Sequence, residues 1–358
     1  MLRYKEDWDE AKKRLIAWWN GEIIDRVLLS VQARREKPVE VIPEMPAPSS
    51  LLERWTNVEY KVNGAERHMA ATFYGGEAFP YFFPYLGPGT LANYLGSEPV
   101  FADDTVWYAK SIEDPDTDRP LRFNPRNRWW KLTVEMYRLA KERGRGKYLV
   151  GFPDLIENFD VLASLRGIDD LLLDVFDRPQ FIHRKQREIL RMFCTYFEKS
   201  YEMVKDDDGG SCFVFDIWGP GKTAKVQCDA SAMLSPGQFR EFVQPYLAEQ
   251  CSWLDFCGYH LDGPPCVQHL DALLEIDSLQ AIQWTPGPQT EGAGSPIYFP
   301  MYRRIKEAGK NVMIFGAKPN EIEPLIRAMG GPERLFISTS VPTEQEAKDL
   351  LRAALRWR

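Results

Sequence analysis

The sequence lacks several features that would assign a protein class at once. No apolar run is long enough to cross a bilayer, and no block of Lys and Arg occurs in a chain of net charge −7. The first absence argues against a membrane-spanning protein. The second disfavours nucleic-acid binding, because neutralising phosphates needs clustered cations. The N-terminus also lacks the apolar segment of a signal peptide, so we expect a cytoplasmic protein.

Residue types that hold metals or carry redox chemistry are sparse. The six cysteines form no C-x-x-C pair, and we expect reduced thiols rather than disulfides. There are only four histidines, at positions 68, 183, 260 and 269. No G-x-G-x-x-G opens a helical segment, which disfavours a dinucleotide-binding Rossmann fold.

What the sequence does contain is a regular alternation of strand-like and helical segments. Strand candidates lie near residues 29, 80, 150, 215, 258, 281, 313 and 336. Eight such units predict an α/β fold, a (β/α)₈ TIM barrel of parallel strands with helices outside; the alternative is an open doubly wound sheet. We expect one domain over residues 1–358. It would have an N-terminal helical extension in 1–26 and inserted, elaborated loops over the barrel mouth in 34–127.

The predicted strand near residue 258 ends in His260 and Asp262. Their spacing of two directs both side chains to one side of the strand. Barrel enzymes carry their catalytic groups at the carboxyl ends of strands, and a His-x-Asp pair suits acid–base chemistry or a hard or borderline metal. The alternative is structural, with His260 bonded to loop backbone and Asp262 capping the next helix.

Other strand ends supply further candidates. Asp216 is expected at the end of a strand over 212–218, either as a catalytic group or in a structural salt bridge, since an acidic group in an apolar strand is costly. The predicted substrate-binding residues are Phe152, Trp218, Gln283, Trp284 and Thr339. Of Gln283 and Trp284, alternation allows only one to point inward. Aromatic walls with few charges would suit a substrate with considerable apolar surface.

Several runs of this sequence resemble the uroporphyrinogen decarboxylase superfamily. They include His260-Leu261-Asp262-Gly263, Ala281-Ile282-Gln283-Trp284 and Leu234-Ser235-Pro236, with Leu86-Gly87-Pro88-Gly89 typical of a decarboxylase-like branch found in anaerobes. The similarity spans nearly the whole chain and implies a barrel. It also implies one of two chemistries, which are decarboxylation without a cofactor and methyl transfer involving a corrinoid carried on a separate small protein.

The resemblance favours methyl transfer. In thiol-methylating members, zinc is held by H-x-C and a later cysteine; His260 matches the histidine, but Asp262 and Ser338-Thr339-Ser340 stand where the cysteines would be. Because the thiolate ligands are absent, His260 and Asp262 are the only candidate zinc ligands that the resemblance leaves. We expect a corrinoid-linked methyltransferase acting on a small O- or N-methyl compound, with acid–base help from His260 and Asp262. The implied partners are that substrate and a corrinoid protein, and a homodimer is left open.

Two other functions remain open at this stage. A decarboxylase would gather arginines in its cleft, and Arg26, Arg34 and Arg35 are the ones to examine, although the family's R-Q-A-G-R-Y pattern is absent. A non-catalytic binding protein on the same scaffold would lock His260 in backbone hydrogen bonds, away from solvent.

Overall fold

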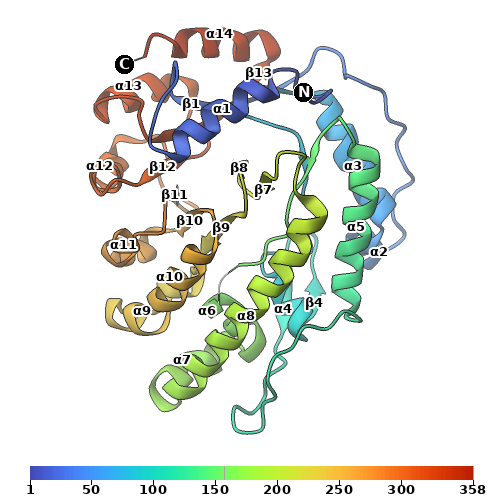
Figure 1. Cartoon of the computed structure of the whole chain (residues 1–358), viewed down its shortest axis with the longest axis vertical. Coiled ribbons are helices and arrows are strands. Elements are labelled where there is room, and N and C mark those ends of the chain that lie inside the picture. The colour runs from blue at the N-terminus through green and yellow to red at the C-terminus, as the bar shows by residue number, and fades with distance from the viewer. Residues whose placement is uncertain (157, 358) are drawn as a thin grey trace.

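The computed structural model describes residues 1–156 and 158–357, and its centre is a seven-stranded sheet (Figure 1). The sheet order is β2-β1-β13-β12-β11-β10-β9. The strands are β1 (Leu28–Arg34), β2 (Thr72–Gly76), β9 (Thr223–Gln227), β10 (Phe256–Asp262), β11 (Ala281–Thr285), β12 (Asn311–Ile314) and β13 (Leu335–Thr343). All neighbours are parallel except β2, which is antiparallel to β1 at one edge. Six carboxyl ends therefore lie along one rim.

Three further strand pairs accompany this sheet. They are the parallel pair β3 (Tyr81–Phe82) with β6 (Leu149–Val150), and the antiparallel pairs β4 (Glu98–Phe101) with β5 (Val106–Ala109) and β7 (Ser211–Phe213) with β8 (Ile217–Gly219). The prediction of one strand over 212–218 is wrong. Phe215 and Asp216 have φ angles of 70° and 53°, which reverse the chain into a hairpin. The next segment, β9, joins the parallel sheet instead.

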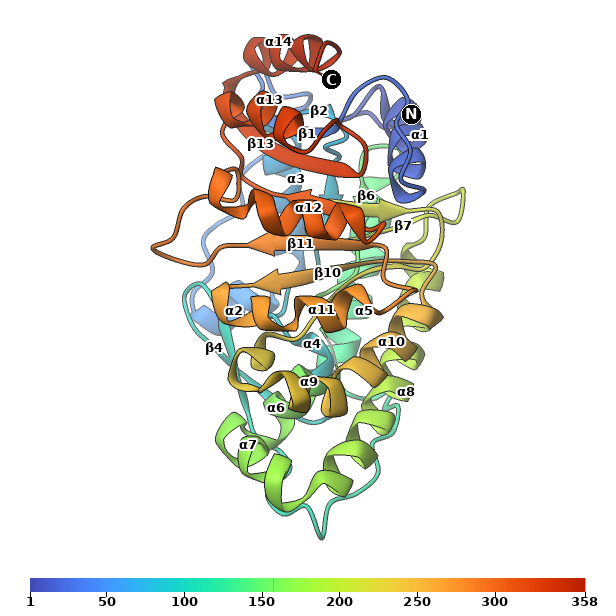
Figure 2. The same cartoon turned by 90° about the vertical axis from the view of Figure 1, so that its left-hand side faces the viewer.

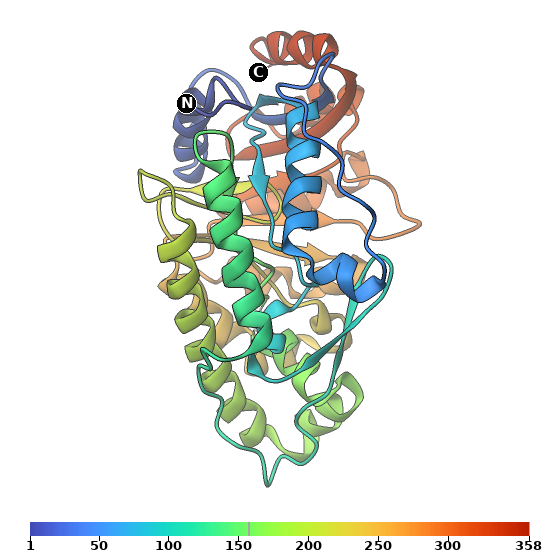
Figure 3. The same cartoon turned by 90° about the vertical axis from the view of Figure 1, so that its right-hand side faces the viewer.

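Helices flank the strands. They are α1 (Trp8–Trp19), α2 (Leu51–Thr56), α3 (Val58–Ala71), α4 (Thr90–Leu95), α5 (Arg128–Gly144), α6 (Asn158–Arg166), α7 (Ile168–Asp177), α8 (Pro179–Val204), α9 (Pro236–Phe242), α10 (Gln244–Trp253), α11 (Leu270–Leu274), α12 (Phe299–Glu307), α13 (Pro319–Ala328) and α14 (Glu344–Ala354), with 3₁₀ helices η1 (Asp229–Met233), η2 (Pro264–His269) and η3 (Pro296–Tyr298). In Figure 2, α11, α12 and α13 lie in front of the sheet, and Figure 3 shows α3 and α5 side by side on the other face. Within the described residues, no helix combines the length and the apolarity that a bilayer crossing requires.

The region expected to hold loops is more regular than predicted. Residues 34–127 contain three helices and four strands, whereas elaborated loops with a single strand near residue 80 were predicted. The apolar period of α3 is hard to see in the sequence because its buried side chains include the acidic Glu66 beside Val62 and Met69. Tyr148 donates a hydrogen bond to Glu66, which offsets the cost of burying that carboxyl group.

Helix α1 lies across the amino ends of the strands. The Trp18 ring contacts Phe336 at 5.5 Å, and Asn311 Nδ2 donates to the Trp18 carbonyl at 2.8 Å. Trp19 Nε1 donates to the Trp218 carbonyl at 2.8 Å. In Figure 2 the arrowheads of β10 and β11 point away from α1. The predicted N-terminal helix therefore covers the rim opposite to the carboxyl ends.

The side chains on the inner face of the sheet change character along the strands. Near α1 they form an apolar cluster that includes Leu28, Ala281, Met313 and Phe336. Two residues further along, toward the carboxyl ends, alternation puts Ser30, Gln283, Phe315 and Ser338 on the same face. The fold thus builds an apolar floor with a more polar layer above it.

Candidate active site

A row of three polar side chains crosses adjacent strands at the carboxyl rim. His260 on β10 is in register with Gln227 on β9 and with Gln283 on β11. The inward residue of the Gln283–Trp284 pair is thus Gln283, whose amide oxygen bonds to His260 Nδ1.

The hydrogen bonds of Gln283 determine the tautomer of His260. Gln283 Nε2 donates to the Trp284 carbonyl at 2.6 Å and to Thr285 Oγ1 at 2.9 Å, which fixes the amide nitrogen on that side. The amide oxygen therefore faces His260 and can only accept, so Nδ1 carries the proton. The other ring nitrogen, Nε2, keeps a lone pair for a metal or a proton.

Three possible metal-ligating side chains converge beside this row. One atom each from Asp229, His260 and Asp262 lies within 4.8 Å of the others. Asp229 is exposed, and the other two are half-buried. The structure therefore brings together the two residues predicted from the His-x-Asp spacing and adds a second carboxylate from the end of β9.

Asp160, near the start of α6, positions Asp229. Its carboxylate accepts hydrogen bonds from the backbone N–H groups of Asp229 at 2.8 Å and Ala230 at 2.9 Å. Gln227 Nε2 also donates to Asp229 Oδ2 at 2.8 Å. These bonds hold the first turn of η1 against α6 and set the direction of the Asp229 side chain.

Burial and neighbouring charge shift the proton affinities here. Burial lowers the pKa of His260, and the nearby Lys225 lowers it further, so the ring is neutral at pH 7. Asp229 is exposed as a residue, but protein atoms crowd its carboxyl group; this desolvation, followed by the proximity of Asp160, raises its pKa to about 8. Both shifts have one cause, namely acidic and basic groups confined in a poorly solvated space.

The site is richer in charge than the sequence suggested. Lys225 on β9 is buried, forms a 2.8 Å ion pair with Asp154 and bonds to Gln227. Carboxyl groups from five aspartates surround or adjoin this interior, at positions 154, 160, 216, 229 and 262. The expectation of a pocket with few charges is therefore wrong.

Asp216 enters the interior from the β7–β8 turn rather than from a strand end. Its Oδ2 accepts a 3.4 Å hydrogen bond from Gln32 Nε2 on β1. The preceding ring, Phe215, lies 4.9 Å from the ring of His260 and 5.8 Å from that of Phe315. Two adjacent non-glycine residues in the left-handed region are strained, and such strain is concentrated at functional sites.

Four predicted substrate-binding residues do not join this group. Phe152 stacks on Phe197 of α8 at 4.2 Å, in the packing between strands and helices. Trp218 is buried near α1, where its Nε1 donates to Asp206 at 3.1 Å. Trp284 packs on Tyr298 of η3 at 5.3 Å.

Thr339, the fourth of these residues, is buried opposite Val31 on β1, on the other face of β13 from Ser338. Of the five predicted substrate-binding residues, only Gln283 contacts the site.

Sequence reasoning missed the contribution of β9. Lys225, Gln227 and Asp229 alternate with the buried Ala224 and Val226, which is the period of a strand with a polar inner face. The sequence contains this alternation, but the preceding run, residues 212–218, is more apolar and was predicted as the strand instead. Nothing in the sequence marks Asp160 as a partner of Asp229, because the two are far apart along the chain.

Comparison with known proteins gives structural similarity without sequence similarity. No protein-family model matches the chain, and no curated protein matches it. Among solved structures, a methyltransferase from Methanosarcina mazei superposes with a TM-score of 0.63 at 14% sequence identity, over 96% of this chain and 98% of that one. At this identity the similarity establishes the fold alone. The chain therefore shares its α/β architecture, over nearly its whole length, with that methyltransferase.

Proposed function

We propose that this protein is a corrinoid-linked methyltransferase that removes a methyl group from a small O- or N-methyl compound. The observation that carries the proposal is the convergence of Asp229, His260 and Asp262 within 4.8 Å at the carboxyl rim of a parallel sheet. Its architecture, which it shares with a methyltransferase, adds support by analogy.

The proposal includes a closed barrel. The pair β3–β6 would complete the ring between β1 and β9, giving eight parallel strands. Leu149 N donates to the Pro80 carbonyl at 3.0 Å within the β3–β6 pair, and Phe152 N donates at 3.2 Å to the carbonyl of Cys212 in β7, the strand that precedes β8 and β9. Such closure would put the site at the mouth, where barrel enzymes carry their chemistry.

His260 is the group we expect to act on the substrate. With Nδ1–H held by Gln283, Nε2 is the nitrogen that faces the reacting groups. A neutral imidazole at pH 7 can bind a metal or, once protonated, act as a general acid toward a leaving oxygen or nitrogen. Asp262 lies close enough to stabilise the imidazolium form.

A divalent metal fits the three side chains. One imidazole nitrogen and two carboxylates are ligands for zinc and other borderline or hard divalent ions, and the Gln283 bond to His260 is the outer contact that such a histidine needs. A bound divalent ion would supply Lewis acidity toward the substrate. Asp229 and Asp262 would hold it from β9 and β10, and Asp160 would keep Asp229 in place.

A corrinoid partner would have to approach from the carboxyl rim, because α1 covers the other one. Asp229 is exposed there, and His260 and Asp262 are half-buried. The corrinoid would accept the methyl group. The residues of this chain would bind and orient the donor and supply or hold a proton at His260 Nε2.

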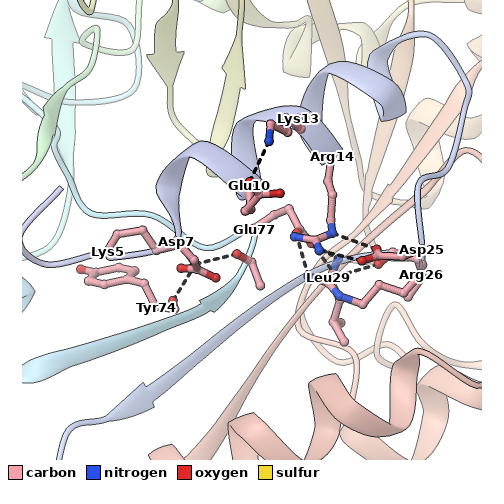
Figure 4. Close-up of polar contacts among 12 residues, drawn as sticks. Lys5, Asp7, Glu10, Lys13, Arg14, Asp25, Arg26, Leu29, Tyr74 and Glu77 are labelled. Carbon is pink, nitrogen blue, oxygen red and sulfur yellow. Dashed lines mark hydrogen bonds and ion pairs between the residues drawn. The ribbon is translucent and has the colours of Figure 1, made fainter. Parts of the chain in front are cut away.

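The decarboxylase alternative is less well supported, because its arginines do not converge. Arg26 is buried in a bidentate pair with Glu77, at 2.7 Å for both bonds, beside α1 (Figure 4). Arg35 donates to the backbone carbonyls of Thr72 and Tyr4, and Arg34 is exposed. A substrate with many carboxylates would find one lysine, already paired, near His260.

The structure also lacks the feature that was predicted for a non-catalytic binding protein. It required His260 to be locked in backbone hydrogen bonds and shielded from solvent. His260 instead bonds to the side chain of Gln283 and remains half-buried.

Two measurements test the proposal. Zinc chloride is added, excess ion is removed and the retained metal is quantified; we expect one ion per chain, lost in His260→Ala and Asp229→Asn. The protein is then mixed with reduced corrinoid protein and a panel of O- and N-methyl compounds, and corrinoid methylation is followed by absorbance. We expect methylation from at least one compound, and its loss in His260→Ala with the fold intact.

His68→Ala is the matched control, because His68 is exposed on α3 and far along the chain from the site. It should keep both metal and activity. Corrinoid methylation from none of the compounds would overturn the proposal in favour of decarboxylation. Loss of folding in His260→Ala would instead assign that residue a structural role.

A further inference from the structure

The carboxyl group of Asp216 has no cationic partner. Among the described residues, no lysine or arginine forms an ion pair with it, and the polar side chains beside it are neutral: Gln32 donates a 3.4 Å hydrogen bond, and Ser30 lies close by. Arg34 lies two residues beyond Gln32 on β1 but is exposed, and no ion pair joins it to Asp216. A partly buried carboxylate without a cationic partner is costly, and the described part of the structure shows no stabilising role that would account for it.

Several aromatic side chains lie in the neighbourhood of this carboxyl group. Phe215 precedes it, and Phe315 lies 5.8 Å from Phe215. The pKa values of Tyr74 and Tyr81 are raised, first by burial and then by the negative charge of Asp216, so both phenols are near it. An acidic group among aromatic faces is the environment that binds organic cations, because each ring face is electron-rich.

The remaining charges near the site are accounted for without Asp216. Lys225 is paired with Asp154, at 2.8 Å, and its Nζ also lies 5.6 Å from the centroid of the Phe215 ring, which shows that this ring can face a cation. A divalent ion at the candidate metal site would neutralise Asp229 and Asp262. Within residues 1–156 and 158–357, Asp160 has no cation beside it either, but two backbone N–H groups bond to its carboxylate. In the same part of the chain, Asp216 has neither a counter-ion nor such backbone bonds.

The place of this charge is accessible and close to the proposed chemistry. Phe215, Asp216, His260 and Phe315 all keep intermediate exposure, although each faces the interior. The ring of Phe215 lies 4.9 Å from the ring of His260. A ligand held at Asp216 would therefore lie next to the imidazole.

We infer that the methyl donor is a quaternary ammonium compound, whose cationic nitrogen is held by Asp216 and the faces of Phe215 and Phe315. This inference rests on the proposed function and specifies its substrate class. The C–N bond would break with both electrons remaining on nitrogen, and the methyl group would pass to the two-electron-reduced corrinoid. The amine leaves neutral, so for this donor class the general-acid role proposed for His260 would not be needed, and its role as a metal ligand would remain.

The test is calorimetric titration with choline and with its neutral isostere 3,3-dimethylbutan-1-ol, without corrinoid. We expect choline to bind at least tenfold more tightly than the isostere. Asp216→Asn should weaken the binding of choline at least tenfold and leave the binding of the isostere unchanged. Asp207→Asn, in an exposed loop, is the matched charge-removal control and should change neither.

Phe215→Leu provides a second variant that keeps apolar bulk but removes the aromatic face. It should weaken choline binding several-fold and leave binding of the isostere unchanged. If Asp216→Asn does not fold, this variant provides the test. Equal binding of choline and isostere, or full preference for choline in Asp216→Asn, would overturn the inference. Binding of neither ligand by the folded wild type at millimolar concentration would do the same.

The inference and the proposed function can fail separately. Selective choline binding that depends on Asp216, in a protein that methylates no corrinoid, would overturn the function and retain the cation site. Corrinoid methylation from neutral O-methyl compounds alone would retain the function and overturn the inference.

Discussion

The unpaired carboxyl group of Asp216 predicts an unusual pH dependence of stability. Burial raises the pKa of Asp216 to about 6, from an ordinary value of 3.8. Between these two values the folded protein holds a proton that the unfolded chain has released. The free energy of unfolding should therefore fall as pH rises from about 4 to about 6, and stay lower above that.

The magnitude follows from the shift. About two pH units at roughly 1.4 kcal/mol each give up to about 3 kcal/mol of lost stability at pH 7.5. Asp216→Asn removes the charge at constant shape and keeps an acceptor for Gln32. The variant should thus be more stable than the wild type by up to about 3 kcal/mol at pH 7.5, with the difference shrinking toward zero near pH 4.

Urea unfolding at several pH values, with Asp207→Asn as the control, measures this difference. The control should track the wild type throughout, because Asp207 is exposed. A difference between Asp216→Asn and wild type that does not vary with pH would refute the reasoning. So would an Asn variant that is less stable at pH 7.5, since the carboxylate would then have a partner that the structure does not reveal.

Three further predictions concern positioning and packing. Gln283→Leu should weaken zinc binding by about 10- to 100-fold, measured by competition with a chelator, because the His260 ring loses the acceptor that orients it; unchanged affinity would contradict the tautomer argument. Trp218→Ala should cost about 3–5 kcal/mol in urea unfolding and leave zinc binding unaltered, since Trp218 packs near α1. Glu77→Gln should cost about 3–5 kcal/mol by the same assay, because it leaves the buried Arg26 charge uncompensated; a change below about 1 kcal/mol would count against this view.

Much of the architecture was predictable because its signals are local. The strands near residues 29, 258, 281, 313 and 336 are apolar runs, and the structure confirms them as members of the parallel sheet. Helices α5 and α8 each have a clear apolar period, which is a signal of the same local kind. Thr343 accepts a hydrogen bond from Glu346 N at the start of α14, another interaction between residues close in sequence.

The errors arose where local signals compete with tertiary structure. An apolar run over 212–218 has the composition of a buried strand, but two positive φ angles reverse it. The true neighbour of β10 carries Lys225 inside, which is tolerated because Asp154, distant in sequence, pairs with it. Composition alone cannot reveal such a partner.

The residues of the candidate site also fall into two groups, those predictable from local spacing and those that depend on tertiary structure. His260 and Asp262 were found because spacing within one strand determines which side they face. The position of Asp229 beside them follows from the pairing of β9 with β10, which the sequence does not show. Phe152 and Trp218 were assigned to the site because they stand at predicted strand ends, whereas their orientation depends on packing partners such as Phe197 and Trp8.

The contact between α1 and the start of β12 has a consequence for how the chain folds. Asn311 Nδ2 meets the Trp18 carbonyl across 293 residues of sequence. The tryptophans of α1 are synthesised before β12, and the surface that buries them is complete only after the 293 residues from Trp18 to Asn311 have been made. Contacts of such long range slow folding and prolong the exposure of apolar groups. Until then, the nascent chain presents an indole-rich helix that other unfolded chains, or a chaperone, can bind.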